Sequence, residues 1–236
     1  MLGRENAAEG AHAPGEADET VAMTIVNRTL REQVLEQLRT ALLEGAFAPG
    51  EKLAEVELAA EFGVSRGTVR EALRTLHNSG LLEGSERSSL HVRRLSPRQV
   101  IELYDVRAAL EGQAIAAILR ADDAQAKIAE LETLLPETRP GMTYAERFEV
   151  DLGFHEALCR LSGNETLLRM WTSIKDLMRI SVLAEPDEVS GSLMAKSHHQ
   201  PIIDAMRTGE PDRARAVLAA HMATAADVWS RKAASR

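Results

Sequence analysis

The amino-acid sequence predicts a mostly α-helical protein made of two parts. Three helices and a β-hairpin come first, and an all-α antiparallel bundle of six or seven helices follows. Apolar residues recur at helical spacing along most of the chain, and Gly and Pro interrupt those runs. A strand pattern occurs only near residues 81–93, and beyond residue 95 the pattern is helical alone. We therefore expect two domains, residues 24–95 and residues 96–236.

The composition is that of an ordinary globular protein and argues against several classes. The 236 residues are 44% apolar and 27% charged, which is enough to bury a sizeable core. Aromatic residues are only 3%, which argues against nucleic-acid binding by base stacking. The chain shows neither a run of the roughly 18–20 apolar residues that span a bilayer nor the apolar segment of a secretory signal. Its one cysteine, Cys159, is typical of a reducing compartment, so we expect a cytoplasmic protein without a membrane partner.

The formal net charge of −8 is unevenly distributed. Residues 1–23 carry −4, are rich in Ala, Glu and Gly, and show no apolar period, so we expect a disordered tail. Residues 24–95 are neutral and residues 96–236 carry −4. The middle segment is therefore the least acidic part of the chain, and its positive charges are clustered.

The N-terminal part has the layout of a winged helix-turn-helix. A helix is expected over residues 29–44 and a short helix over residues 55–63, ended by a glycine. Ser65 is the expected N-cap of the next helix, which Gly80 ends. Two short strands around a polar turn follow, and they predict the hairpin wing. This order of elements is typical of a DNA-binding module.

The second helix of this helix-turn-helix carries a basic ridge. Arg66, Arg70 and Arg74 are spaced four residues apart, opposite an apolar stripe. Such a ridge, led by a helix N-terminus, suits the phosphates and base edges of a major groove, and the Ser65 hydroxyl could hold a phosphate. The alternative is a solvated face partly paired with Glu71. The position on the second helix favours DNA contact.

Basic residues also flank the predicted hairpin. Arg87 lies at its tip, and Arg93 and Arg94 lie at its base. We expect these side chains to reach the adjacent phosphate backbone or the minor groove.

The segment "LAEVELAAEFGVSRGTVREALRTLHNSGLL" resembles the GntR family of bacterial transcription regulators. This resemblance implies that Ser65, Arg66, Gly67 and Arg70 contact DNA. The chain departs from the family at Gly67-Thr68, where Thr-Pro is usual, and at the wing tip, where "ERSSL" replaces a Gly-rich turn. Because Gly67 lacks a side chain that could contact the operator, relatives do not provide the operator sequence.

The C-terminal part shows only helical patterns. Ser96 and Pro97 begin the first helix as N-cap and first helical residue. Helices are expected over residues 96–120, 122–135, 143–161, 165–183, 189–208 and 212–230.

Polar residues fall on the buried faces of three of these helices. On a helical wheel, Asp151 and His155 lie in the apolar stripe of their helix. His199 and His221 lie in the apolar stripes of two further helices, and His198 lies one position away from the stripe that contains His199. Burying such groups without partners costs about 1–3 kcal/mol each. Two explanations stay open: a buried Asp–His hydrogen bond with the other histidines satisfied separately, or a shared divalent metal. Imidazoles with a carboxylate suit Zn²⁺, and also Ni²⁺ or Mn²⁺.

Arg107 also points inward on its helix, beside Glu111. The two could form a buried ion pair. Equally, Arg107 could act as a bidentate clamp for a carboxylate effector.

The segments "DLGFHEALCRLSGN" and "HHQPIIDAM" resemble the all-helical FCD effector domain of the FadR-like branch of this family. The resemblance implies metal ligands at Asp151, His155, His199 and His221, with His198 where an acid is usual. It also implies that a small organic acid binds to the metal and a nearby Arg.

Taken together, these features predict a ligand-responsive transcription regulator that is not an enzyme. We expect a homodimer bound to a palindromic double-stranded operator, because two-fold symmetry matches such a site. One alternative is a metallohydrolase fused to a DNA-binding module, for which Glu111 is the only additional inward carboxylate. A second alternative is a non-responsive DNA binder with a structural metal.

Overall fold

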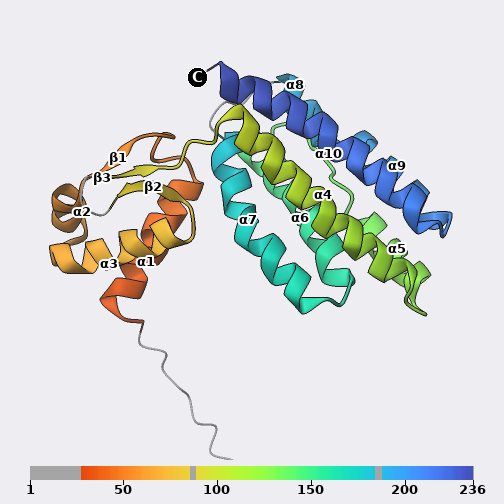
Figure 1. Ribbon diagram of the computed structural model, residues 1–236, viewed down its shortest axis with the longest axis horizontal. Helices are drawn as coiled ribbons and strands as arrows, with labels where there is room; N and C mark the ends of the chain where they lie inside the picture. The colour runs from red at the N-terminus through yellow and green to blue at the C-terminus, as the bar shows by residue number, and fades with distance from the viewer. Residues whose placement is uncertain (1–27, 86–88, 184–187, 236) are drawn as a thin grey trace, which may run out of the picture.

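The computed structural model describes residues 28–85, 89–183 and 188–235, and it confirms the predicted mostly helical fold class (Figure 1). The predicted tail, residues 1–23, and the wing-tip residue Arg87 lie outside the described residues. Among the described helices, none has both the length and the apolarity needed to cross a membrane.

The N-terminal module packs helices against a small sheet. Its helices are α1 (Leu30–Leu43), α2 (Glu55–Phe62) and α3 (Arg66–Asn78). Its strands are β1 (Lys52–Leu53), β2 (Leu82–Ser85) and β3 (Ser89–Val92), in the antiparallel order β1-β3-β2. The apolar faces of all these elements form one hydrophobic core.

Strand β1 was not predicted, because the segment before it contains Gly and Pro and was interpreted as a loop. Gly50 N–H donates to the carbonyl of Val92, and Val92 N–H donates to the carbonyl of Glu51, both at 2.8 Å. These two bonds extend the hairpin into a three-stranded sheet, and Leu53 is buried beneath it. A two-residue strand is too short to produce an alternating pattern in the sequence.

The turn between α2 and α3 follows the predicted capping. Gly63 ends α2 in the left-handed conformation, with φ of 64°. Ser65 is the N-cap of α3, and its Oγ accepts from Thr68 N–H at 3.1 Å. The turn thus places the N-terminus of α3 and its basic ridge at the surface.

The wing also depends on a glycine. Gly84 in β2 has a φ of 116°, and a Cβ atom there would lie 2.3 Å from the carbonyl oxygen of Ser89. Only glycine fits this close approach of the two strands.

The C-terminal bundle contains seven helices within the described ranges. They are α4 (Pro97–Leu119), α5 (Ala124–Thr133), α6 (Tyr144–Leu161), α7 (Glu165–Leu183), α8 (Glu188–Leu193), α9 (Lys196–Arg207) and α10 (Pro211–Ala234). Helices α4 and α10 lie side by side over much of their length, and α6 packs on α4 (Figure 1). A second hydrophobic core fills the space between these helices.

The single helix expected over residues 189–208 was wrong, because α8 and α9 are separate. Ala195 has an extended backbone (φ −81°, ψ 153°) and is the N-cap of α9. The apolar spacing continues across this one residue, so periodicity did not reveal the break. At this break the Ala195 carbonyl accepts from the backbone N–H of His198 and also lies 3.0 Å from His199 Nδ1.

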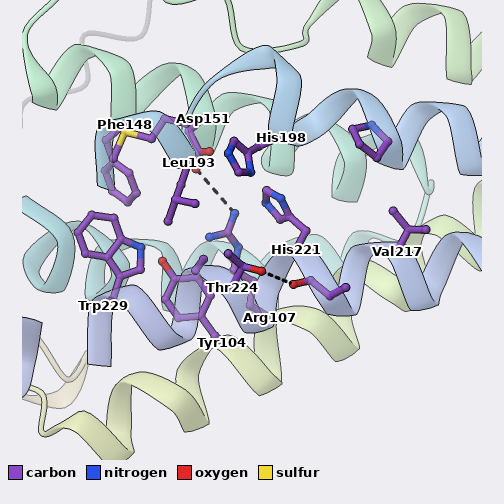
Figure 2. A pocket seen from close by; sticks show the side chains of 14 residues that line it. Tyr104, Arg107, Phe148, Asp151, Leu193, His198, Val217, His221, Thr224 and Trp229 are labelled. Carbon is purple, nitrogen blue, oxygen red and sulfur yellow. Dashed lines mark hydrogen bonds and ion pairs between the residues drawn. The ribbon is translucent and has the colours of Figure 1, made fainter. Parts of the chain in front are cut away.

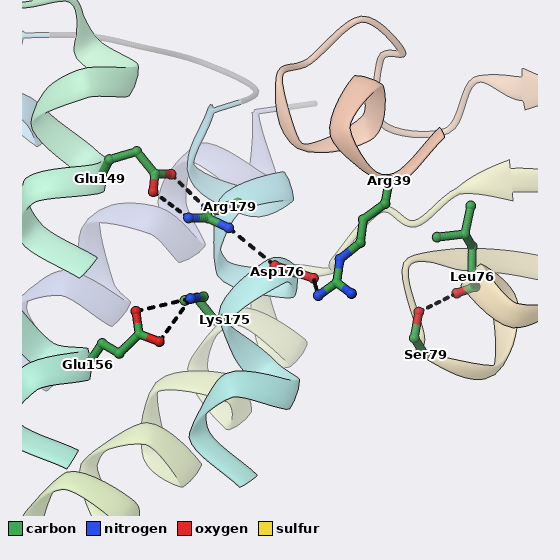
Figure 3. A network of polar contacts seen from close by, with 8 residues as sticks. All are labelled: Arg39, Leu76, Ser79, Glu149, Glu156, Lys175, Asp176 and Arg179. Carbon is green, nitrogen blue, oxygen red and sulfur yellow. Dashed lines mark hydrogen bonds and ion pairs between the residues drawn. The ribbon is translucent and has the colours of Figure 1, made fainter. Parts of the chain in front are cut away.

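Helix α7 connects the two modules. Ile180 of α7 is buried in the hydrophobic core of the N-terminal module, and Leu177 packs against both cores. Asp176 of α7 forms an ion pair with Arg39 of α1 (Figure 3). The position of the N-terminal module is therefore tied to this helix.

Candidate DNA interface and candidate metal site

The predicted basic ridge lies on the surface of α3, and an acid on α2 holds one of its members. The Arg70 guanidinium donates to both oxygens of Glu55, with distances of 2.9 Å from Nε and 2.7 Å from Nη2. The Nη2 atom of Arg66 lies 3.9 Å from the same carboxylate. The hydrogen bond from Arg70 lowers the pKa of Glu55. The expected partner Glu71 forms no ion pair with these two arginines in the part of the chain that is described.

The remaining DNA candidates lie around this ridge. Arg66, Arg70 and Arg74 line a groove between α3 and the strands of the sheet. The Ser65 hydroxyl caps α3 and contacts the hydroxyl of Thr68 at 2.9 Å. A Cβ atom at Gly67 would meet only Ser65 Oγ, at 3.6 Å, so the backbone does not require glycine there.

Three helices bring three histidines together. His155 of α6, His199 of α9 and His221 of α10 place one ring nitrogen each within 4.8 Å of the others. The two Nε2 atoms of His155 and His199 lie 3.2 Å apart, and Asp151 Oδ1 lies 3.0 Å from His199 Nε2. The four residues predicted as metal ligands are therefore adjacent.

Hydrogen bonds behind the rings determine which nitrogens face one another. His155 Nδ1 lies 2.6 Å from Glu111 Oε2, and His199 Nδ1 lies 3.0 Å from the carbonyl of Ala195. Both partners are acceptors, so both Nδ1 atoms donate. In the neutral imidazoles the Nε2 lone pairs then point toward a common centre, which is the arrangement of metal-binding histidines with outer hydrogen-bond partners.

The spacing of these atoms fits a first-row divalent ion. Two nitrogens that each lie about 2.0–2.1 Å from a tetrahedral Zn²⁺ are about 3.3–3.4 Å apart. The observed Nε2–Nε2 distance is 3.2 Å. Asp151 and His199 are in contact, but the hydrogen-bonding alternative would place the His199 proton on Nε2 and leave Nδ1 and the Ala195 carbonyl, two acceptors, facing each other. That contact alone gives no reason for the rings of His155 and His221 to converge on the same point.

The protonation states favour cation binding. Burial lowers the pKa of His155 and lowers that of His221 to about 4, so both rings are neutral near pH 7. Burial raises the pKa of Asp151, but its contact with His199 and the nearby Arg107 guanidinium outweigh this effect, and the net pKa is lowered. Neutral imidazoles and an ionised carboxylate are the forms that bind metal.

Arg107 forms the buried pair with Glu111, and one end of its guanidinium is left without a hydrogen-bond partner among the described residues. Arg107 is 2% exposed, and its Nε donates to Glu111 Oε1 at 2.8 Å, as expected for a buried pair. Its Nη2 lies 4.0 Å from Asp151 Oδ2 and has no hydrogen-bond partner among the described residues. A buried donor without a partner is uncommon in folded proteins.

Sequence reasoning missed one residue of this network. The indole N–H of Trp171, on α7, donates to Glu111 Oε1 at 2.9 Å. Together with Arg107 and His155 it satisfies both oxygens of a fully buried carboxylate. The apolar spacing of α7 indicates that Trp171 is inward, but no local pattern indicates its partner on α4.

A cavity of about 290 Å³ opens beside the cluster (Figure 2). Arg107, Asp151 and His221 line it on one side, while His198 contributes to its wall from an exposed position. A small molecule in this cavity would therefore contact the guanidinium and the candidate metal ligands together.

Comparisons with known proteins identify the family of both parts of the chain. Residues 30–92 match the family described as bacterial regulatory proteins, gntR family, and residues 102–224 match the FCD domain. A probable D-xylose utilization operon transcriptional repressor of Paenarthrobacter nicotinovorans is 29% identical over 203 residues, covering 84% of this chain and 88% of the relative. An uncharacterized HTH-type transcriptional regulator of Streptomyces ambofaciens is 33% identical over 200 residues, covering 83% of each chain.

A solved structure shows the same fold. A GntR transcriptional regulator from Rhodococcus sp. RHA1 aligns with a TM-score of 0.69 at 25% identity, covering 84% of this chain and 96% of that one. These relatives are regulators rather than enzymes, so the hydrolase alternative is set aside. The chain belongs to the GntR family of bacterial transcriptional regulators and carries an FCD domain.

Proposed function

We propose that this regulator senses a small carboxylate at a buried divalent-metal site and thereby changes its affinity for an operator. The observation that carries the proposal is the Arg107 Nη2 group, which is buried and lacks a hydrogen-bond partner among the described residues. It lines the same cavity as Asp151 and His221. A carboxylate in this cavity would satisfy the guanidinium by a charge-assisted hydrogen bond.

Asp151, His155, His199 and His221 would hold the metal, with Zn²⁺ as the best fit and Ni²⁺ or Mn²⁺ as alternatives. The ion would supply a positive charge to an effector oxygen. Glu111 and the carbonyl of Ala195 keep two of the rings oriented toward the ion.

The position of the cavity supports sensing over a purely structural metal. The cavity reaches Asp151 and His221, so an external molecule can approach the metal ligands. A structural site is usually closed, with all positions filled by the protein.

The contacts of α6 and α7 suggest how sensing reaches the DNA-binding module. Helix α6 carries Asp151 and His155, and it also carries Glu149, which pairs with Arg179 of α7. Arg179 Nη1 lies 3.4 Å from Asp176 Oδ1, and Asp176 pairs with Arg39 of α1 (Figure 3).

A second link joins the same two helices, since Lys175 of α7 donates to Glu156 of α6 at 3.0 and 3.1 Å (Figure 3). An effector that binds one arrangement of α6 more tightly than another would therefore bias the pose of α1 and of the module that contains it.

For DNA contact we propose five residues on α3 or at its N-cap: Ser65, Arg66, Gly67, Arg70 and Arg74. Their exposure and their position beside the groove of the module support this assignment.

Arg87 remains a further DNA candidate from the sequence alone. We also propose a cytoplasmic homodimer on a palindromic operator, with the domain boundary near residue 95. The molar mass of the purified protein in light scattering, free and bound to DNA, tests the dimer.

The experiment for the metal and the effector uses the full-length protein. Metal content is measured in protein purified without added metal, in wild type, His199→Ala and His198→Ala, where His198 is the matched neighbour on α9. We expect bound metal in wild type and His198→Ala and its loss in His199→Ala. Binding to a duplex selected by the wild-type protein from a random pool is then titrated with carboxylates. The proposal would be contradicted if His199→Ala kept its metal, or if no carboxylate changed the affinity for DNA.

A further inference from the structure

We propose that the effector is a carboxylate with an aromatic body, and not a sugar acid or another polyhydroxylated acid. The inference rests on the proposed function, because it takes the Arg107 side of the cavity as the carboxylate anchor. It concerns the wall of the cavity away from Arg107, because carboxylate binding at Arg107 does not account for the residues found there.

Three aromatic side chains from three helices line this wall. Tyr104 of α4, Phe148 of α6 and Trp229 of α10 all border the cavity. Figure 2 shows their rings grouped on one side of the Arg107 guanidinium, with His221 on the other. The chain has only eight Phe, Trp and Tyr residues in total, two Trp, two Tyr and four Phe, so three of them meet at one small cavity.

Neighbouring groups fix two of these rings in place. The Trp229 ring contacts Tyr144 edge-on, with centroids 6.3 Å apart, and the Lys232 ammonium lies 4.8 Å from its centroid. The Arg107 guanidinium carbon lies 5.5 Å from the Tyr104 ring centroid. The wall is therefore preorganised, and a flat ring would gain edge or stacking contacts beyond the burial of its area.

The same part of the cavity offers few donors or acceptors to a hydroxylated ligand. The Thr224 hydroxyl donates to the carbonyl of Ala220 at 2.9 Å within its own helix. Apart from the Tyr104 hydroxyl, the Trp229 indole N–H and the His198 ring, the remaining wall is apolar and includes Leu193, Met194, Pro201, Val217 and Ala225. Each hydroxyl of a sugar acid buried here without a partner would weaken binding substantially.

The size of the cavity limits the aromatic acid to a small one. Its volume of about 290 Å³ is near the lower end of small-molecule sites, which are roughly 300–1,000 Å³. One ring bearing a carboxylate, directly or through a short linker, matches this volume.

The test measures binding to full-length, Zn²⁺-loaded protein by calorimetry with four probes. Benzoate carries ring and charge, benzamide carries the ring without charge, gluconate carries charge with hydroxyls, and acetate carries charge alone. We expect benzoate to bind at least about tenfold more tightly than each of the other three. Gluconate binding as tightly as benzoate would overturn the aromatic inference while leaving carboxylate sensing intact.

The other outcomes separate the two proposals. Benzamide binding as tightly as benzoate would overturn the carboxylate anchor of the proposed function and leave the aromatic wall standing. Binding of none of the four probes would overturn both.

A substitution in the aromatic wall tests whether this wall recognises the ring of the ligand. Phe148→Leu should reduce the ratio of benzoate affinity to acetate affinity about three- to tenfold, because one ring contact is lost. Phe62→Leu makes the same change in the N-terminal module and should not alter this ratio. An equal effect in both variants, or none in Phe148→Leu, would show that the wall does not recognise a ring.

Discussion

At the residue scale, Glu111 connects the two halves of the candidate site. One oxygen accepts from His155 Nδ1, and the other accepts from Arg107 Nε and Trp171 Nε1. The same fully buried carboxylate therefore orients a metal ligand and the proposed effector anchor. Burial lowers the pKa of Arg107, but Glu111 and nearby groups outweigh it and the net pKa is raised, so the anchor stays charged.

The substitution Glu111→Gln should weaken Zn²⁺ binding about 10- to 100-fold. If the Gln amide oxygen keeps the hydrogen bonds from Arg107 and Trp171, its NH₂ faces His155 Nδ1 and favours the wrong tautomer. Competition with a chromogenic chelator measures the affinity, and thermal unfolding checks that the variant folds. Glu102→Gln, on the exposed face of the same helix, is the control. Unchanged affinity in Glu111→Gln would mean that this carboxylate does not orient His155.

Arg70 and Glu55 form the corresponding pair on the DNA side. Arg70→Ala should weaken DNA binding about tenfold or more if it contacts a base, with little loss of stability, because exposed ion pairs contribute at most about 1 kcal/mol. Glu55→Gln should strengthen binding, since it frees Arg70 and removes a negative charge. Gel-shift titration on the selected duplex measures both, with Arg98→Ala on α4 as control. Marked destabilisation of Arg70→Ala would instead indicate a structural role.

At the element scale, α7 is the helix that both modules share. Its Ile180 belongs to the N-terminal core, while its Trp171 contacts Glu111 at the candidate metal site. Its polar face carries Lys175, Asp176 and Arg179, which pair with α6 and α1. A helix held from both sides in this way can transmit a displacement as a rigid body.

The substitution Asp176→Asn should reduce the effect of the carboxylate on DNA affinity, because it removes the charge that holds Arg39 and Arg179. Zn²⁺ affinity should stay within about twofold of wild type, since Asp176 is not a proposed ligand. DNA titrations with and without the most effective carboxylate give the coupling, typically about 1–3 kcal/mol in such systems. Asp204→Asn, an exposed position on α9, is the matched control. Full coupling in Asp176→Asn would exclude this route.

At the scale of the whole molecule, the buried histidine cluster links stability to pH and metal. His221 has its pKa lowered from 6.5 to about 4, and the pKa of His155 is also lowered. Below about pH 6.5, these two histidine rings therefore bind protons more readily in the unfolded chain than in the folded protein. The stability associated with these rings is fully present above about pH 6.5 and is lost as the pH falls toward 4.

Metal-free protein, prepared with a chelator, should therefore show a midpoint of thermal unfolding that falls between pH 6.5 and pH 4. His221→Gln should make this fall smaller. At pH 7, added Zn²⁺ should raise the midpoint, because an ion that binds only the folded state stabilises it. A flat pH profile together with no response to Zn²⁺ would contradict both the burial of neutral histidines and the metal assignment.

Features that depend on local spacing could be predicted from the amino-acid sequence alone. The N-cap at Ser65, the end of α2 at Gly63 and the inward positions of Asp151 and His155 follow from backbone geometry over one or two helical turns. These features were sufficient to predict the fold class and the set of candidate ligands.

Contacts between residues far apart in the sequence, in contrast, follow from the packing of the helices and strands. Arg70 pairs with Glu55 and not with Glu71. Trp171 of α7 donates a hydrogen bond to Glu111 of α4. Strand β1 forms because β3 provides its hydrogen-bonding partner. The aromatic wall likewise combines residues from α4, α6 and α10. Such contacts depend on how helices and strands pack, and periodicity along one element carries no information about the side chains that another element brings to it.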